Sequence, residues 1–293
     1  MNDALTNPVS FDAALEKFLD HLRLQKRSSA TVVAYNSDIN QLKSHLAGQR
    51  ITQATTVQTP HLEDFIRHIT ANGYTAKSVS RKINSIKTFF KFLLEKGLHA
   101  TDPAAPLTHP KYATTPPRVL SESEFKSLRE AVRLDIRMSA VIEILLQTGA
   151  RISETANLRV DDIHKGELVI RAWENNPART IPLGKSAQSA VQNYLAVRPK
   201  VTDDHLFITK TGRPLLVRNI RTSIDRFFKA AGVKGAKVND LRHTFVAHQL
   251  AGGVDPEFLS KTVGHKRLSS TSKYLDQMKP SSNLSFSSKL IEL

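Results

Sequence analysis

Three short clusters hold the side chains of this chain that are best suited to chemistry. They are TGARISETANL at residues 148–158, NDLRHTFVAH at residues 239–248 and GHKRLSSTSKY at residues 264–274. Four of their side chains are the candidates for chemistry, namely Arg151, Arg242, His265 and Tyr274. Tyr274 follows His265 by nine residues, and it is one of only five tyrosines in a chain of 293 residues.

These residue types suit the transfer of a phosphodiester to a tyrosine. Planar guanidinium groups bind two nonbridging phosphate oxygens with permanent charge, and a histidine donates a hydrogen bond or moves a proton near neutral pH. A tyrosine, with an ordinary pKa of about 10, becomes a usable nucleophile if the cationic pocket lowers that pKa. The chain has no paired carboxylates at metal-ligand spacing, no GxxxxGK loop, no GxSxG motif and no cysteine. We therefore expect neither a metal site nor a thiol nucleophile.

The three clusters resemble the signature boxes of the tyrosine recombinase family, most closely those of its Xer-like and phage-integrase-like members. The first is similar to TGLRxSEL, the second to HxLRHTxAT and the third to LGHxxxxTTxxY, and the resemblance covers nearly the whole chain. It implies a site-specific DNA recombinase that cuts and rejoins strands through a 3′-phosphotyrosyl intermediate on Tyr274, without a metal or nucleotide cofactor. It also implies that Arg151 and Arg242 bind the phosphate, with His265 and Asn239 assisting.

The chain departs from the family pattern at two positions. The family has a proton-transferring histidine three residues before the second arginine, where this chain has Asn239. It also has a general-acid lysine in a hairpin turn, whereas the corresponding RAWENNPARTIPLG contains none. Depending on where the gap is placed, Ala172 or Glu174 takes the lysine's position. The possible basic substitutes are Arg171 and Arg179. A second hypothesis therefore stays open, a catalytically weak or inactive DNA-binding relative that acts as an accessory or architectural factor.

Each candidate residue also has an ordinary structural interpretation. Arg151 could bind a carboxylate such as Glu154, and Tyr274 could be a half-buried core tyrosine. We interpret His243 and His248 as residues that support their own helix. The functional interpretation is favoured for Arg151, Arg242, His265 and Tyr274. Otherwise four residues with ordinary structural roles would all have to match the family's motif spacing by chance.

Periodic apolar residues predict the elements that position these clusters. A pair of helices is predicted over residues 11–46, a third over residues 60–72 and a fourth over residues 76–96. A proline-rich segment follows. After it the pattern predicts a helix capped by Ser121, an apolar helix over residues 138–147, a β-hairpin over residues 166–184, and helices that begin near residues 186, 217, 240 and 256.

The expected fold is mostly α with a small β-sheet. An all-α, SAM-like core-binding domain precedes an α+β catalytic domain, and the resemblance implies a C-shaped clamp around duplex DNA. The expected segments are the core-binding domain at residues 9–104, a stiff linker at 105–117, the catalytic domain at 118–277 and a tail at 278–293. The resemblance further implies that the tail docks on a neighbouring protomer of a homo-tetramer on DNA, or of a hetero-tetramer with a related recombinase.

The charge of the chain points to a polyanionic partner. Lysine and arginine number 42 against 27 aspartates and glutamates, which leaves a formal charge of +15 and makes nucleic acid the simplest partner. No apolar run could span a membrane and no signal-peptide pattern is present, so we expect a cytoplasmic, nucleoid-associated protein. The basic residues expected to contact DNA, with a solvated surface charge as the alternative, are Arg81, Lys82, Lys87, Lys91, Lys266 and Arg267.

Overall fold

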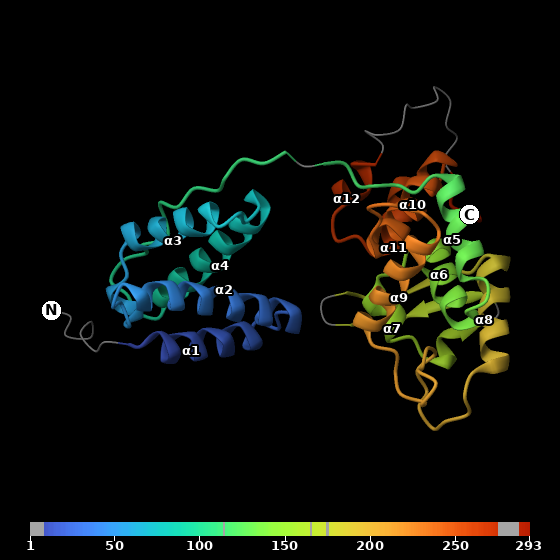
Figure 1. Ribbon diagram of the computed structural model, residues 1–293, viewed down its shortest axis with the longest axis horizontal. Helices are drawn as coiled ribbons and strands as arrows, with labels where there is room; N and C mark the ends of the chain where they lie inside the picture. The colour runs from blue at the N-terminus through green and yellow to red at the C-terminus, as the bar shows by residue number, and fades with distance from the viewer. Residues whose placement is uncertain (1–8, 114, 165, 174–175, 275–286) are drawn as a thin grey trace. The chain divides into compact units, whose positions relative to one another are not determined.

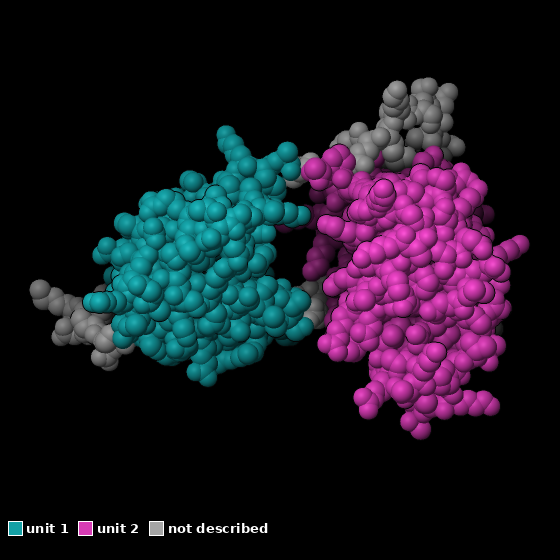
Figure 2. Space-filling view, in the orientation of Figure 1, with its two compact units in different colours: residues 1–114 teal, residues 115–293 magenta. Residues whose placement is uncertain are grey.

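The protein divides into two compact units, residues 1–114 and residues 115–293 (Figure 2). The computed structural model describes residues 9–113, 115–164, 166–173, 176–274 and 287–293. The division lies inside the segment that the sequence predicts as a linker. Leu107, within that segment, and Ala104, just before it, are buried in the core of the first unit. Packing of the first unit therefore extends into the proline-rich stretch.

The first unit is a helical bundle. Within its described residues, 9–113, the α-helices are α1 (Phe11–Leu24), α2 (Ser29–Gly48), α3 (Thr59–Ala71) and α4 (Ala76–Glu95) (Figure 1). Ser10, Ser28 and Thr75 cap three of these helices by accepting hydrogen bonds from backbone N–H groups in the first turn. The apolar faces meet in one core, where Phe18 packs edge-on against Phe89. The four helices predicted for this unit are confirmed.

The polar face of α4 differs from the expectation at one residue. Lys82 is buried, with a side chain that is 6% exposed, and its Nζ donates to Asp38 of α2 at 2.9 Å. Arg81 donates to the same carboxylate but stays half exposed. The prediction that Lys82 contacts DNA is therefore wrong, because a buried aspartate 44 residues earlier holds its charge inside the bundle.

The remaining basic residues of α4 lie nearer to solvent. Lys91 is exposed and has Glu95 one turn away, at 3.9 Å. Lys87 is partly buried and its Nζ donates to the carbonyl of Ala105 at 3.1 Å. DNA contacts from Arg81, Lys87 and Lys91 stay a prediction.

The second unit surrounds a buried helix, α6 (Ile136–Thr148), with further helices and a small sheet. The other helices of this unit are α5 (Glu122–Val132), α7 (Ile152–Ala156), α8 (Lys185–Val197), α9 (Val217–Ala230), α10 (Val238–Ala251), α11 (Pro256–Val263) and α12 (Ser269–Ser272) (Figure 1). Helix α6 packs against both α8 and α10, which explains why it is apolar on nearly every face. The predicted capping box at Ser121 and Glu124 begins α5, as expected.

The sheet of the second unit has three antiparallel strands in the order β1–β2–β3. The strands are β1 (Ile163–His164), β2 (Glu167–Ile170) and β3 (Arg179–Pro182). In the register of the hairpin, Leu168 faces Ile181, and both side chains enter the core. The hairpin is confirmed, whereas the two-residue β1 is too short to be recognised from its pattern.

The C-terminal residues 287–293 lie against the second unit of their own chain (Figure 1). Ser287 pairs with Val254 as an isolated bridge, and Gln249 accepts a hydrogen bond from the backbone of Ile291 at 2.8 Å. Gln147 and Arg129 both donate to the carbonyl of Leu293. Docking of this tail on a neighbouring protomer stays a prediction, since the structure contains one chain. Among the described residues, no helix has the length and apolar character needed to cross a membrane.

Candidate active site

Arg242 is buried in the second unit, between the ends of two helices. It lies on α10 with 6% of its surface exposed, and its guanidinium donates to the carbonyls of Gly149 and Val263, the second at 2.8 Å. Gly149 ends α6 in the left-handed conformation with φ of 60°, and an added Cβ would lie 2.5 Å from the Phe245 ring. Glycine is thus required at the residue that exposes this carbonyl.

Arg151 reaches the same region from the start of α7. Its Nη1 donates to Glu154 at 2.9 Å, and its Nη2 donates to the carbonyl of Gly264 at 2.6 Å. The pairing with Glu154 expected from the structural interpretation is therefore present, together with a second contact at the turn that ends α11. Because Arg242 contacts Val263 and Arg151 contacts Gly264, the two guanidinium groups meet at consecutive residues of one turn.

Arg179 on β3 binds Glu154, the carboxylate that also pairs with Arg151. Its side chain is 7% exposed, both terminal nitrogens donate to Glu154 at 3.0 and 2.7 Å, and its Nε donates to the carbonyl of Thr262. Burial alone would raise the pKa of Glu154, but the hydrogen bonds from Arg179 and Arg151 lower it. Each of the three Arg179 nitrogens thus donates to a group inside the protein, and Arg179 as a substitute for the missing lysine stays a prediction.

His265 follows the turn and is held in its neutral form. Its Nδ1 lies 2.7 Å from Thr271 Oγ1, and Thr271 is fully buried. Burial, followed by the charges of Arg242 and Arg151, lowers the pKa of His265 to about 3. With the threonine hydroxyl donating to Nδ1, the ring keeps its proton on Nε2 and can donate a hydrogen bond from there.

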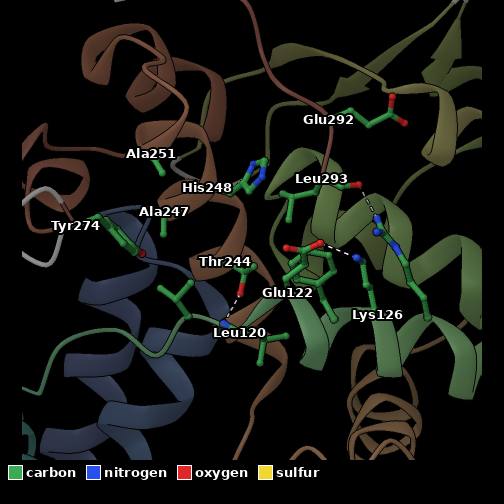
Figure 3. Close-up of a pocket in the computed structure, with 13 residues that line it drawn as sticks. Leu120, Glu122, Lys126, Thr244, Ala247, His248, Ala251, Tyr274, Glu292 and Leu293 are labelled. Atoms are coloured by element: carbon green, nitrogen blue, oxygen red, sulfur yellow. Dashed lines mark hydrogen bonds and ion pairs between the residues drawn. The ribbon is translucent and has the colours of Figure 1, made fainter. Parts of the chain in front are cut away.

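Tyr274 lies beside α10 with its hydroxyl turned toward that helix (Figure 3). The residue is 2% exposed, and its hydroxyl is hydrogen-bonded to His243 Nδ1. Burial raises the pKa of Tyr274 to about 12, although the charge of Arg242 acts in the opposite direction. The condition that the cationic pocket lowers the tyrosine pKa is therefore not met in this conformation, because loss of hydration outweighs the cationic neighbour.

His243 was interpreted from the sequence as a supporting residue, and the structure places it in the site. It lies one turn after Asn239 on α10, and Asn239 Nδ2 is 2.8 Å from His243 Nε2. The i,i+4 spacing of these two residues is a signal in the sequence that could have paired them. The contact between His243 and Tyr274 joins residues 31 positions apart and has no local signal.

The positive charges of the site are close enough to affect one another. Burial and then the charge of Arg151 lower the pKa of Arg242 to about 9, so the guanidinium is still charged at neutral pH. Crowded cations in a poorly hydrated site attract an anion strongly, because its arrival relieves their mutual repulsion. The arrangement is therefore suited to a group with one or two negative charges, such as a phosphodiester.

Comparison with known proteins assigns the family. The model described as "Phage integrase family" matches residues 118–280, more than half of the chain, and that described as "Phage integrase, N-terminal SAM-like domain" matches residues 15–97. The chain belongs to the phage integrase family. It is therefore a tyrosine recombinase and an enzyme, and the predictions of the family, of site-specific recombination and of a mostly helical fold with a small sheet are confirmed.

Three relatives illustrate the match. Tyrosine recombinase XerC of Corynebacterium efficiens is 32% identical over 270 residues, which cover 89% of this chain and 86% of that protein. Tyrosine recombinase XerD of Listeria monocytogenes is 30% identical over 274 residues, covering 89% and 92%. The crystal structure of a lambda integrase tetramer bound to a Holliday junction has a TM-score of 0.72 at 17% identity, covering 91% of this chain and 82% of that one. The last likeness is one of fold.

The remaining hairpin candidates for the position of the family's general-acid lysine are Arg171, Ala172 and Glu174. Arg171 is more than half exposed and donates from Nε to Asp162 at 2.6 Å, which raises its pKa. Ala172 is exposed, and Glu174 lies outside the described residues. Arg171 as a substitute for the lysine stays a prediction, as do DNA contacts from Lys266 and Arg267, both exposed directly after His265.

A groove of about 690 Å³ lies beside Tyr274, between α5, α10 and the C-terminal residues (Figure 3). Phe125, Ala247 and Leu293 supply apolar walls, and the ring of Tyr274 lines one end. Thr244 fixes the chain entering α5 by accepting a hydrogen bond from the backbone of Leu120 at 2.8 Å. The apolar surroundings explain why burial dominates the pKa of Tyr274.

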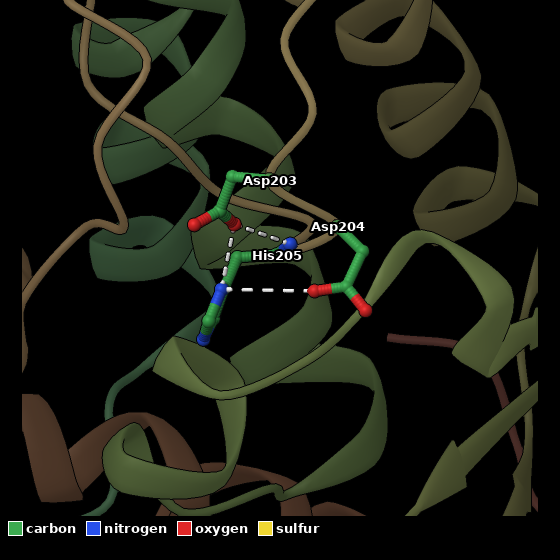
Figure 4. Close-up of side chains that lie close together, drawn as sticks. All are labelled: Asp203, Asp204 and His205. Atoms are coloured by element: carbon green, nitrogen blue, oxygen red, sulfur yellow. Dashed lines mark hydrogen bonds and ion pairs between the residues drawn. The ribbon is translucent and has the colours of Figure 1, made fainter.

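One acidic cluster lies elsewhere in this integrase-family chain. Asp203, Asp204 and His205 have their ligand-type atoms within 4.8 Å of one another (Figure 4). The backbone N–H of His205 and then its Nδ1, at 2.7 Å, bond Asp203 and lower the pKa of that carboxyl group. Asp204 pairs with Arg159. Each carboxylate already has a basic partner, so we assign no metal to this cluster.

Proposed function

We propose that this recombinase cuts and rejoins DNA strands at a specific site through a 3′-phosphotyrosyl intermediate on Tyr274. The observation that carries the proposal is the convergence of one buried tyrosine, two guanidinium groups and two imidazoles within a single unit. A covalent tyrosine ester conserves the energy of the phosphodiester, so that the strand can be rejoined without a nucleotide or metal cofactor.

The proposed roles follow from the donors that each residue offers. Arg151 and Arg242 exchange their carbonyl partners for the nonbridging oxygens of the scissile phosphate, where charge develops during attack. His265, neutral and protonated on Nε2, donates a hydrogen bond to the same phosphate. Asn239 is exposed at the edge of the site and assists through its amide.

The proposed partner is duplex DNA, and the working unit is a tetramer on two DNA sites. A formal charge of +15 and the exposed cations Arg81, Lys91, Lys266 and Arg267 support binding to the phosphate backbone. A lambda integrase tetramer on a Holliday junction, similar in fold, supports the assembly. We further propose that residues 9–104 form the core-binding domain and residues 118–277 the catalytic domain. The tetramer is a homo-tetramer or, as the alternative, a hetero-tetramer with a related recombinase, and the enzyme works on the nucleoid.

A suicide substrate tests the proposal. A duplex with a nick close to the scissile phosphate loses the short 5′-hydroxyl fragment by diffusion, so that a covalent complex accumulates and is seen as a slower band on a denaturing gel. Wild type should form this complex and Tyr274→Phe should not, whereas the control Tyr112→Phe, which changes an exposed tyrosine of the first unit, should form it as wild type does. If wild type binds DNA but forms no covalent complex, the chain is a DNA-binding relative and the proposal fails.

A further inference from the structure

His243 makes a direct hydrogen bond to the proposed nucleophile. Its Nδ1 is bonded to the hydroxyl of Tyr274, and the two rings lie with their centroids 5.8 Å apart. In the part of the chain that the structure describes, no other side chain is hydrogen-bonded to that hydroxyl, and His265 uses its Nδ1 on Thr271 instead. The geometry therefore connects one imidazole, and not the other, with the tyrosine proton.

Asn239 occupies the other side of the His243 ring. Its amide nitrogen Nδ2 lies 2.8 Å from Nε2, and a 180° rotation of the amide about its Cβ–Cγ bond puts the acceptor oxygen Oδ1 in the same place. With the oxygen toward Nε2, the imidazole keeps its proton on Nε2 and presents the lone pair of Nδ1 to the tyrosine hydroxyl. Asparagine at this position can thus hold the base form of His243, although it cannot carry a proton itself.

The surroundings of His243 keep it neutral at pH 7. Burial lowers its pKa below the usual 6.5, and the positive charges near it act in the same direction, whereas Asp240 opposes them. The titratable groups that face it from its own helix and from the segment around α12 are Asp240, Arg242, His265, Lys273 and Tyr274.

We propose that His243 is a catalytic residue, the general base that takes the proton of Tyr274 when the tyrosine attacks DNA. This inference rests on the proposed function of Tyr274. The Tyr274 O–H bond breaks as its proton moves to His243 Nδ1, and the phenolic oxygen forms a bond to phosphorus. The bond from phosphorus to the 5′-oxygen breaks, and that oxygen takes a proton from water. On rejoining, the 5′-hydroxyl attacks phosphorus and gives its proton to water, the bond from phosphorus to the Tyr274 oxygen breaks, and the imidazolium returns its proton to that oxygen.

The test uses a substrate with sulfur in place of the bridging 5′-oxygen. A thiolate leaves without protonation, so the rate of covalent complex formation depends on activation of the tyrosine alone. His243→Asn is the test variant, because asparagine places a hydrogen-bonding group near the position of Nδ1 but does not accept a proton at neutral pH. His248→Asn is the matched control, the same change on the same helix at a ring whose Nδ1 has no hydrogen-bond partner.

We expect His243→Asn to lower the rate of covalent complex formation by a factor that depends on pH. At pH 7 His243→Asn should form the complex roughly 100-fold more slowly than wild type, the lower end of what a general base contributes. The rate of the variant should rise about tenfold per pH unit, because phenolate becomes more abundant below the tyrosine pKa, whereas wild type is level once His243 is neutral. The difference should therefore shrink to roughly tenfold at pH 8. Added imidazole should restore part of the rate, and His248→Asn should match wild type.

Other results would overturn the inference. A loss of less than about threefold, far below the contribution of a general base, excludes His243 from proton transfer. An equal loss at every pH, with no rescue by imidazole, assigns it a structural role. Gel-shift affinity and thermal unfolding of His243→Asn exclude loss of binding or folding as the cause. If wild type forms no complex at Tyr274 on either substrate, the proposed function itself fails, and the role of His243 fails with it.

Discussion

Replacing Glu154 with glutamine removes the counter-ion of a buried arginine, and the consequence for stability can be estimated. The side chains of Glu154 and Arg179 are 5% and 7% exposed, so water screens this pair weakly. Glu154→Gln keeps the size of the side chain but leaves the Arg179 guanidinium without a negative charge beside it. Breaking a buried ion pair costs about 3–5 kcal/mol. In a unit of this size each kcal/mol lowers Tm by roughly 2–4 °C, so the expected decrease is roughly 6–20 °C.

Thermal unfolding of the full chain, followed by circular dichroism, measures the decrease in Tm. Glu130→Gln is the control, since Glu130 pairs with Arg133 on the surface with 72% of its side chain exposed, and its loss should leave Tm nearly unchanged. The double variant Glu154→Gln with Arg179→Met should recover part of the decrease, because the unpaired buried charge is then absent.

The ion pair between Glu154 and Arg179 should also make the stability of the protein depend on pH. Burial would raise the pKa of Glu154, but Arg179 and Arg151 hold it below the ordinary 4.5, so the stabilisation is present above about pH 4.5 and is lost as the pH falls through the lowered value. The difference in Tm between wild type and Glu154→Gln should narrow in acid. The reasoning would be refuted if Glu154→Gln lowered Tm no more than Glu130→Gln does. It would also be refuted if the difference in Tm between wild type and Glu154→Gln did not change in acid.

Three further predictions concern the reaction and the binding of DNA. Arg151→Lys and Arg242→Lys should each reduce cleavage of the suicide substrate roughly 100-fold or more while DNA binding is retained, because an ammonium cannot reproduce a two-pronged contact; cleavage near the wild-type rate would exclude that arginine from phosphate binding. Affinity for DNA should fall steeply with salt, and Tyr274→Phe should bind like wild type in gel-shift titrations, whereas affinity independent of salt would count against backbone contacts. DNA with a bridging 5′-sulfur should be cleaved much faster than ordinary DNA, because a general acid contributes roughly 100- to 10,000-fold and the sulfur does not need one. Glu174→Lys or Ala172→Lys should narrow the difference in cleavage rate between the two substrates. Equal rates, with chemistry rate-limiting, would mean that another proton donor is present.

The sequence predicted the helices and the hairpin because each leaves a local signal. The capping box at Ser121, the glycine after α6 and the alternation of the hairpin are all readable within a few residues. The spacing of the motifs also predicted that Arg151, Arg242, His265 and Tyr274 belong to one site, and their catalytic roles stay a prediction. In the structure Arg151 and Arg242 meet at one turn. Burial and then the charge of Arg242 lower the pKa of His265, and the same charge opposes the effect of burial on the pKa of Tyr274.

What the sequence could not predict depends on partners that are distant along the chain. Lys82 is buried because Asp38 faces it from another helix, and Arg179 is committed because Glu154 lies across the turn from β3. Nothing in the sequence near His243 indicates its contact with Tyr274, because the two residues are 31 positions apart and only the fold brings them together. The raised pKa of Tyr274 could not be predicted for a related reason, because the motifs show the nearby cations but not the extent of burial.

The central claim is that Tyr274 forms the covalent bond to DNA, and mapping that bond tests the claim most directly. The covalent complex on the nicked substrate can be digested with nuclease and trypsin, and the peptide that carries the remaining nucleotide can be sequenced by mass spectrometry. We predict that the nucleotide is attached through its 3′-phosphate to Tyr274. Attachment to any other residue, or a wild-type enzyme that binds the substrate and yields no nucleotide-bearing peptide, would contradict it.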